Sequence, residues 1–375
     1  MTARILGDRW EHVKSLGKGS FGTVHLFRDA MTHGLYAVKF IECTELAKEE
    51  AVQKEVLNHC QLSHGNIARF KEVILCPPYL AIVMEYASGG DLFNAVQEAK
   101  GHRLSESTAR YFFQQLMSGL GYMHNMGMCH RDMKLENLLI NGNPPRLKIC
   151  DFGYSKSSKW QSAAKSKVGT AAYIAPEVIT AKQGANYRGE ACDVWSSGVV
   201  LHTMLVGMYP FCDRSAPNDE MRTIHRIMDF FNGKRQYEPP PNIDQSAVNL
   251  LRGMLTTDPE KRLTIAEIVQ SPWFRQNLPN GFSLNAQPAD PNWVQQTPAE
   301  VAAILKLAAQ PFAAPVAAPG GNYQEEDADT DPMTPSTSLT CAISLLDSSC
   351  LMTDNNCDGD ENLESIESNR SAPRC

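Results

Sequence analysis

The alternation of hydrophobic and polar residues changes character near Tyr86. Before this residue, short segments alternate or run apolar with many β-branched side chains, as strands do, whereas 48–60 has helical spacing. After it, the spacing predicts helices at 107–127, 193–207 and 246–255. The pattern therefore predicts an α+β protein with two lobes, joined near Met84–Ala87. The N-lobe is a small antiparallel sheet with one helix, and the C-lobe is larger and helical.

The pattern changes again near Phe274, where the folded domain is predicted to close. A Pro/Asn-rich linker follows, and then a short helix with Thr297 as its predicted N-cap, Pro298 as its first residue and Glu300 completing a capping box. Its apolar residues form one stripe, so the helix must dock on another part of the protein. They are Val301, Ile304, Leu305 and Ala308.

These boundaries divide the chain into segments of different character. The expected segments are an N-terminal segment 1–9, an N-lobe 10–86, a C-lobe 87–274, a linker 275–294, a docking helix 295–311 and a tail 312–375. The tail is acidic and rich in Ser, Asp and Asn, and a composition of this kind predicts disorder.

Composition and charge exclude several classes of function. Of the net charge of −7, the stretch Leu307–Cys375 contributes −10, so the rest of the chain carries only about +3. This balance does not suit the dense basic face of a nucleic-acid-binding protein. No apolar run reaches the ~18 residues of a membrane span, and the N-terminus lacks the apolar core of a signal peptide. We therefore expect a soluble protein of the cytoplasm, the nucleus or both, with no nucleic-acid or membrane partner.

The 11 cysteines show no paired metal-binding spacing, because no CxxC occurs. In a chain without a secretory signal they are expected to stay reduced. Two interpretations of Cys150 stay open: a small buried apolar residue, which is the commoner case, or a redox-sensitive thiol.

The stretch LGKGSFGTV, Leu16–Val24, contains the spacing G-x-G-x-x-G. Glycines allow a hairpin backbone to approach phosphate oxygens with its amide groups as donors. Taken alone this is a weak signal, but the segment after it reads as a strand, YAVK, and not as the helix of a dinucleotide-binding unit. The spacing therefore favours the glycine-rich loop of a kinase.

Lys39 lies in that strand between apolar residues, so its charge needs a partner. Glu55, on the following predicted helix, is the expected one. Together they would hold the α- and β-phosphates of ATP. A solvated surface lysine is the alternative, and it would be preferred if Lys39 stood alone.

The segment CHRDMKLENLLI, Cys129–Ile140, is far more specific. It has the spacing of a kinase catalytic loop, in which Asp132 takes the hydroxyl proton, Lys134 steadies the γ-phosphoryl group and Asn137 binds Mg²⁺. The DFG motif at Asp151 follows and supplies a second metal carboxylate, and APE closes the segment at 175–177. Five such elements in the correct order predict a phosphotransferase that uses ATP and Mg²⁺.

On these motifs, residues 10–274 resemble a eukaryotic protein kinase of the Ser/Thr class. The resemblance implies that Thr170 bonds the catalytic Asp and Lys. It also implies that Asp193 anchors the catalytic loop and that Arg262 pairs with Glu177. The ATP site would then comprise Leu16, Gly17, Lys18, Gly19, Ser20, Phe21, Gly22, Val24, Ala37, Lys39, Met84, Glu85, Ala87 and Leu139.

Within that site, the resemblance gives each residue of the adenine pocket a role. The Glu85 carbonyl and the Ala87 amide would bind the adenine, with Met84 as gatekeeper. The ring would lie between the apolar side chains of Val24, Ala37 and Leu139.

A closer resemblance rests on VMEYASGGDLF, LKICDFGYSKSS, VGTAAYIAPEV and QQTPAEVAAILKLAAQP. These segments are similar to the plant and algal sucrose-non-fermenting-related kinases of subfamily two, which act in stress and osmotic signalling. In that subfamily the C-terminal helix packs along the helix that bears Glu55. The chain departs from the pattern at Lys167 and Ala171, where Thr and Pro are usual, and its acidic tail is dilute.

Asp91 and Glu136 stand at the acidic positions by which many kinases bind an Arg three residues before the acceptor. Two carboxylates suit a guanidinium fork, so an Arg-x-x-Ser/Thr preference is predicted. Thr203 replaces a further glutamate of some such kinases. Two exposed acids without a role are the alternative.

The segment between DFG and APE is the expected activation loop. Arg131, beside the catalytic Asp, is a cation suited to a phosphoserine, which carries a charge of about −1.5 to −2. Matched to the subfamily, Ser166 is the main candidate phosphosite and Ser162 the second, whereas Ser157 and Ser158 are expected to be ordinary loop residues.

Two other interpretations stay open. A pseudokinase scaffold would use the fold for binding alone, but such proteins typically lose residues that this chain keeps, namely Lys39, Asp132 and Asp151. A checkpoint or energy-sensing Ser/Thr kinase would share the catalytic residues but not the docking helix. The expected partners are protein substrates and either a regulatory protein phosphatase or an upstream kinase, and the protein is expected to be a monomer.

Overall fold

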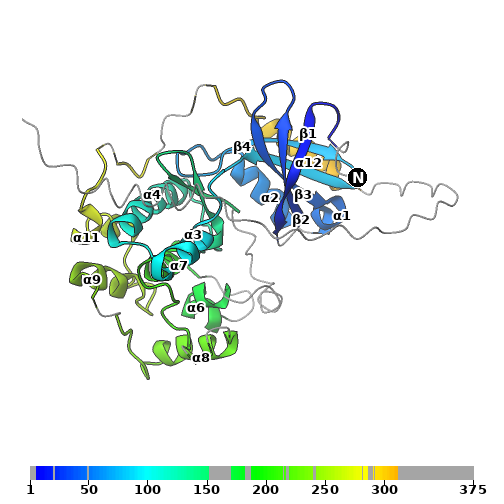
Figure 1. Ribbon diagram of the computed structural model, residues 1–375. Helices are drawn as coiled ribbons and strands as arrows, with labels where there is room; N and C mark the ends of the chain where they lie inside the picture. Colours follow the sequence, from blue (N-terminus) through cyan, green and yellow to red (C-terminus); the bar gives the residue numbers. More distant parts are fainter. Residues whose placement is uncertain are drawn as a thin grey trace, which may run out of the picture.

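The computed structural model describes most of the chain up to Gln310. The described residues are 6–19, 22–48, 50–151, 170–181, 187–213, 215–216, 219–239, 242–280, 282–285, 290 and 292–310, without the side chains of 19, 47, 48, 50, 51, 55 and 170. They form two lobes, a sheet-rich N-lobe that also holds the C-terminal helix α12, and a helical C-lobe (Figure 1). The predicted α+β, bilobal architecture is confirmed.

The N-lobe sheet has five antiparallel strands in the order β1-β2-β3-β5-β4. They are β1 (Trp10–Gly19), β2 (Gly22–Asp29), β3 (Leu35–Glu42), β4 (Phe70–Cys76) and β5 (Tyr79–Glu85). Alternate residues of β3 face opposite sides, so Phe40 joins the apolar cluster around Trp10 and Phe27, whereas Ile41 joins the cluster beneath the helices. Both faces of the sheet are therefore covered in the middle of β3.

Helices cover one face of this sheet. The predicted helix is present as α2 (Glu50–His59), and the structure adds a shorter helix before it, α1 (Cys43–Lys48). Of the described side chains of α1, those of Cys43 and Leu46 are buried. Six residues hold too few periodic positions to predict a helix from the sequence.

Helix α12 (Pro298–Ala308) begins with the predicted capping box between Thr297 and Glu300. Its stripe is buried against α2 and the sheet, with Val301, Leu305 and Ala308 at most 2% exposed. It contacts α1, α2 and β4 (Figure 1). The expectation that this helix docks along the helix bearing Glu55 is thus confirmed.

The C-lobe is built around two long helices, α4 (Glu106–Asn125) and α7 (Gly189–Val206). The other α-helices among the described residues of this lobe are α3 (Leu92–Glu98), α6 (Pro176–Thr180), α8 (Glu220–Phe231), α9 (Gln245–Met254), α10 (Ile265–Ile268) and α11 (Pro272–Arg275). Strands β6 (Leu138–Asn141) and β7 (Arg146–Ile149) form a hairpin at the part of the C-lobe that faces the N-lobe, where Ile149 pairs with Ile67. Helix α7 ends at Gly207, which is left-handed with a φ of 78°. Among the described helices, none combines the length and apolar character needed to cross a membrane.

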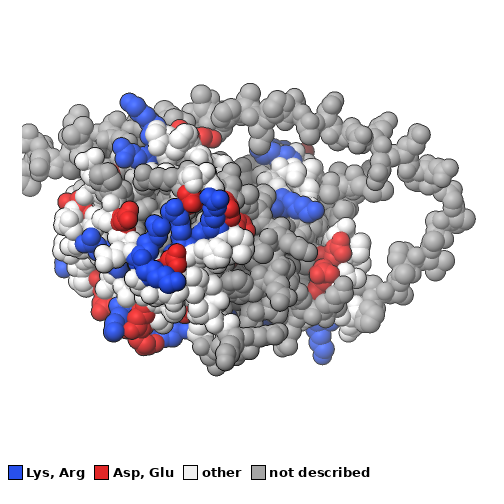
Figure 2. Space-filling view, turned by 90° about the horizontal axis from the view of Figure 1, so that it is seen from below, with Lys and Arg blue, Asp and Glu red and all other residues white. Residues whose placement is uncertain are grey.

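Charged side chains of both signs lie interspersed on the C-lobe surface seen in Figure 2. The C-lobe also has exposed ion pairs such as Arg188–Glu260. The pair between Arg262 and Glu177 is different, because the Arg262 side chain is 0% exposed and both its terminal nitrogens donate to the Glu177 carboxylate, at 2.6 and 2.8 Å. This bidentate pair fastens α6 to the loop before α10, as the resemblance implied.

We expect Glu177→Ala to lower the free energy of unfolding by about 3–5 kcal/mol, because it leaves the buried Arg262 charge without its carboxylate. The matched control is Glu260→Ala, which removes the exposed partner of Arg188 and should cost less than about 1 kcal/mol. Urea unfolding of both variants, followed by circular dichroism, measures the difference. Equal losses in the two variants would contradict the structural role of the Arg262–Glu177 pair.

Candidate active site

The glycine-rich hairpin joins β1 to β2, with Gly19 opposite Gly22 and Gly17 opposite Val24. A side chain at Gly22 would collide with the carbonyl oxygen of Phe40 on β3. Packing on β3 is thus a second reason for a glycine here, besides the expected approach of phosphate. Leu16 is 38% exposed at the mouth of this hairpin. Ser20 and Phe21, at its tip, lie outside the described residues.

Lys39 on β3 is buried, and its Nζ lies 2.5 Å from Oδ1 of Asp151. Burial would raise the pKa of Asp151, but the charge and the hydrogen bond of Lys39 outweigh it and lower this pKa below its ordinary value. Asp151 is therefore ionised at neutral pH. The side chain of Glu55, the expected partner of Lys39 on α2, lies outside the described residues.

The catalytic-loop candidates converge on one carboxylate. Lys134 Nζ lies 2.8 Å from Asp132 Oδ2, and Asn137 Nδ2 donates to the same oxygen at 3.0 Å. Burial lowers the pKa of Lys134, but the Asp132 charge raises it by more, so the lysine is firmly protonated. The side chain of Thr170, which was expected to join this group, is not described.

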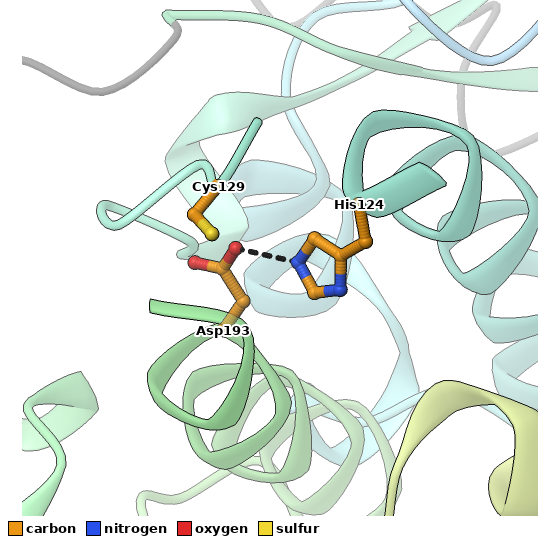
Figure 3. Close-up of side chains that lie close together, drawn as sticks. All are labelled: His124, Cys129 and Asp193. Carbon is orange, nitrogen blue, oxygen red and sulfur yellow. Dashed lines mark hydrogen bonds and ion pairs between the residues drawn. The ribbon is translucent and has the colours of Figure 1, made fainter. Parts of the chain in front are cut away.

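Asp193 holds the backbone of this loop. Its Oδ2 accepts from the amide of His130 at 2.8 Å and its Oδ1 from the amide of Arg131 at 2.7 Å. His124 Nε2 lies 2.9 Å from the same carboxylate (Figure 3). His124, Cys129 and Asp193 lie within 4.8 Å of one another, but the hydrogen bonds already made by Asp193 favour an anchor over a metal site.

The anchor matters because Arg131 has a φ of 66°, a left-handed conformation that is uncommon for a residue with a side chain. The structure adds His130 to the set found from the sequence. Its Nδ1 accepts from the amide of Asp132, and its Nε2 lies 3.1 Å from the carbonyl of Cys150. His130 thereby joins the catalytic loop to the residue before Asp151. Its place in the CHRD segment was the only sequence signal for this role.

The residues expected around adenine line the junction of the lobes. Ala37 on β3 pairs with Met84 on β5, and Val24 on β2 pairs with Lys39. Leu139 comes from β6 of the C-lobe, and the chain passes between the lobes through Glu85 and Ala87. Burial raises the pKa of the nearby Cys150 thiol, which disfavours a reactive thiolate there.

Asp91 and Glu136 lie close enough that the charge of Asp91 helps to raise the pKa of Glu136. Burial is the largest cause for both, and the pKa of each carboxyl is above its ordinary value. Asp91 is the N-cap of α3, where it accepts from the amide of Asn94 at 2.8 Å. Among the described residues, Glu136 Oε2 has no hydrogen-bond partner although it is buried. Two crowded carboxylates are a suitable binding site for a cation.

The metal candidates have a donor set that fits a hard divalent cation. The amide nitrogen of Asn137 is held by the backbone carbonyl and the carboxylate of Asp132, which leaves the amide oxygen as its ligand atom. Asp151 supplies an ionised carboxylate. Oxygen ligands of this kind suit Mg²⁺.

The candidate phosphosites Ser162 and Ser166 lie outside the described residues, and their proposed partner Arg131 is exposed at the edge of the catalytic loop.

Comparisons with known proteins agree with this geometry. Residues 10–274 match the family described as the protein kinase domain. The chain is 47% identical to the serine/threonine-protein kinase SAPK2 of Oryza sativa subsp. japonica, over 86% of this chain and 96% of the relative. It is 52% identical to SRK2E of Arabidopsis thaliana, over 72% and 73% of the two chains. It is also 49% identical to SRK2A of Physcomitrium patens, over 80% and 85%. Both are described as serine/threonine-protein kinases.

We expect Lys39→Met to lower the rate of phosphate transfer at least ~100-fold, because a preorganised buried charge is lost from the site. Lys14→Met is the matched control, since Lys14 is an exposed lysine on β1 of the same sheet. Transfer of labelled phosphate from ATP to a protein substrate measures the effect, with circular dichroism to verify folding. A folded Lys39→Met variant within tenfold of the wild-type rate would show that Lys39 has no such role.

Proposed function

Since the chain belongs to the serine/threonine protein kinases of the sucrose-non-fermenting-related subfamily two, we propose the reaction and specificity that its site performs. It transfers the γ-phosphoryl group of Mg-ATP to Ser and Thr hydroxyls of proteins that carry an Arg three residues upstream. The observation that carries this proposal is the convergence of Lys134 and Asn137 on Asp132. That arrangement fixes a carboxylate oxygen at the point where an acceptor hydroxyl must be oriented.

In this reaction Asp132 orients the acceptor hydroxyl and takes its proton. Lys134 stays charged because its pKa is raised, and it stabilises the negative charge of the transferred group. Asn137 and Asp151 would hold the Mg²⁺, which would supply charge neutralisation to the phosphates. Lys39 orients the α- and β-phosphates from the N-lobe, together with Glu55.

The nucleotide lies between the lobes. Backbone groups of Glu85 and Ala87 bind the adenine edge, and the apolar side chains of Val24, Ala37 and Leu139 cover its faces. The hairpin from Leu16 to Val24 covers the phosphates from above. The pairing of Ala37 with Met84 supports this placement, because it puts the gatekeeper residue Met84 next to Ala37, one of the residues expected to cover the adenine ring.

Specificity comes from Asp91 and Glu136. A guanidinium group would give a donor to Glu136 Oε2, which has no hydrogen-bond partner among the described residues, and would neutralise two carboxylates whose pKa values are raised. At the preceding subsite an Arg should contribute less to substrate binding, because Thr203 stands where some such kinases have a glutamate. Its hydroxyl is buried and donates to the carbonyl of Val199, and it carries no charge.

Regulation comes from the activation loop and from α12. Phosphorylation of Ser166, with Ser162 second, switches the kinase on by giving Arg131 an anionic partner. Docking of α12 on α2 supports the subfamily-two assignment against a checkpoint or energy-sensing kinase. The kinase acts as a monomer in stress and osmotic signalling in the cytoplasm or nucleus, under an upstream kinase and a regulatory phosphatase.

We expect Asp91→Asn to raise the KM for an Arg-x-x-Ser peptide about tenfold or more, because one charge-assisted hydrogen bond is lost. Asparagine keeps the N-cap of α3, so the change removes charge and little else. Asp244→Asn, at the N-cap of α9, is the matched control.

The pH dependence provides a second test of this site. Because both pKa values are raised, the KM for the Arg peptide should increase as the pH falls from 7 toward 5, while that of a peptide without Arg should not. Unchanged Arg preference in an Asp91→Asn, Glu136→Gln variant would refute the site.

We expect dephosphorylated wild type to gain phosphate at Ser166, from itself or an upstream kinase, and to become more active. Intact-mass analysis after incubation with ATP and Mg²⁺ measures the gain. Ser166→Ala should stay at low activity, Asp132→Ala should transfer no phosphate, and Ser157→Ala should behave as wild type. No phosphate transfer to a protein substrate by wild type already phosphorylated at Ser166 would overturn the proposed reaction, whereas full activity of Ser166→Ala would overturn only the switch.

A further inference from the structure

Behind the hinge lies an ion cluster that the proposed reaction does not use. The Glu85 carboxylate is only 8% exposed and lies 2.9 Å from Lys148 Nζ through Oε1 and 3.2 Å from Arg69 Nε through Oε2. Arg69 precedes β4 of the N-lobe, whereas Lys148 lies on β7 of the C-lobe. A single hinge carboxylate therefore bonds both lobes.

Besides the ion pair, the backbone of Arg69 makes two hydrogen bonds with Glu85. The Arg69 carbonyl accepts from the Glu85 amide at 2.8 Å, and the Arg69 amide donates to Glu85 Oε2 at 3.1 Å. Main chain and side chain of Glu85 are thus fixed by the same residue. Any group that fixes Arg69 also fixes the hinge.

The C-terminal extension fixes Arg69 from the outside. We call Asp290 and residues 292–296 the strap. Asp290 Oδ2 lies 2.9 Å from Arg69 Nη1, and the Arg69 guanidinium carbon lies 4.0 Å above the ring of Trp293. A planar guanidinium between two carboxylates and an aromatic face has little freedom left.

The strap itself is fastened to β4, the edge strand of the sheet. Trp293 Nε1 donates to the Phe70 carbonyl at 2.7 Å, and the Gln296 amide donates to the Lys71 carbonyl at 2.8 Å. The Gln296 side chain then bonds both backbone groups of Val73. These bonds pair polar groups that an edge strand would otherwise leave open.

We propose that the strap is a positioning element for nucleotide binding, in which Asp290 and Trp293 hold Arg69 on Glu85 and so set the hinge that receives adenine. This action is distinct from the docking of α12 on α2. It rests on the proposed placement of adenine at Glu85 and Ala87. If the strap is loosened, the hinge adopts more conformations. Nucleotide binding must then select one of them, and this costs binding free energy.

Titration calorimetry of the full chain with a nonhydrolysable ATP analogue and Mg²⁺ tests this. We expect Asp290→Asn and Trp293→Leu each to weaken binding about fivefold, the lower end of typical couplings between sites. The kcat at saturating ATP should change less than about twofold, because α12 stays docked. Val294→Ala is the matched control, since Val294 lies in the same strap and is 78% exposed.

Coupling between sites is reciprocal, which gives a readout independent of activity. Bound analogue should slow hydrogen exchange at the Gln296 amide in wild type, and Arg69→Lys should abolish the slowing because lysine lacks the planar fork. Unchanged affinity in both strap variants, or equal loss in Val294→Ala, would overturn the proposal. If wild type bound no analogue, the proposed adenine site would be wrong instead.

Discussion

The buried carboxylate of Asp193 is the constraint on which the catalytic loop depends. It is 1% exposed and accepts two backbone hydrogen bonds from the turn that contains Arg131. A left-handed φ at such a residue costs about 1–3 kcal/mol, whereas each hydrogen bond to a buried charge contributes about 1.5–3 kcal/mol. The two bonds thus outweigh the strain. They hold Asp132, the next residue, where Lys134 and Asn137 reach it.

Ion pairs connect the two lobes at the hinge and on the phosphate side. The two apolar clusters on the faces of the N-lobe sheet are separate from the large cluster of the C-lobe, which Leu62 and Ile67 join from the N-lobe side. Lys39–Asp151 and Glu85–Lys148 also cross the junction, and the side chains of Lys39, Glu85 and Lys148 are at most 8% exposed. A buried pair gains little net stability after desolvation, but it specifies one geometry because either charge alone would be costly. Such contacts suit two bodies that must keep one alignment around a ligand.

The sequence predicted best what is close together along the chain. Asp132, Lys134 and Asn137 fall within six residues, so their spacing alone indicates convergence, and the Thr297–Glu300 capping box is equally local. The Arg69–Asp290 pair joins residues 221 positions apart, and no period or motif links them. A tryptophan in a Pro/Asn-rich linker was the available signal, because Trp293 is an unusual residue to leave in solvent. Glu177–Arg262 was accessible only through the family resemblance, for the same reason of distance.

The C-terminal extension completes the N-lobe as well as following the domain. Burial of a Val or Leu side chain contributes about 1.5–3 kcal/mol, and Val301 and Leu305 are almost fully buried against Val52 and Val56 of α2. Without α12 this face of α2 would be exposed to water. The strap reaches a second place, the back of the hinge. One segment therefore contacts both N-lobe elements that the proposed reaction needs aligned, α2 behind the phosphates and the hinge beside adenine. Separate residues make the two contacts, Trp293 and Gln296 on β4 and Val301 and Leu305 on α2, so a change in one leaves the other in place.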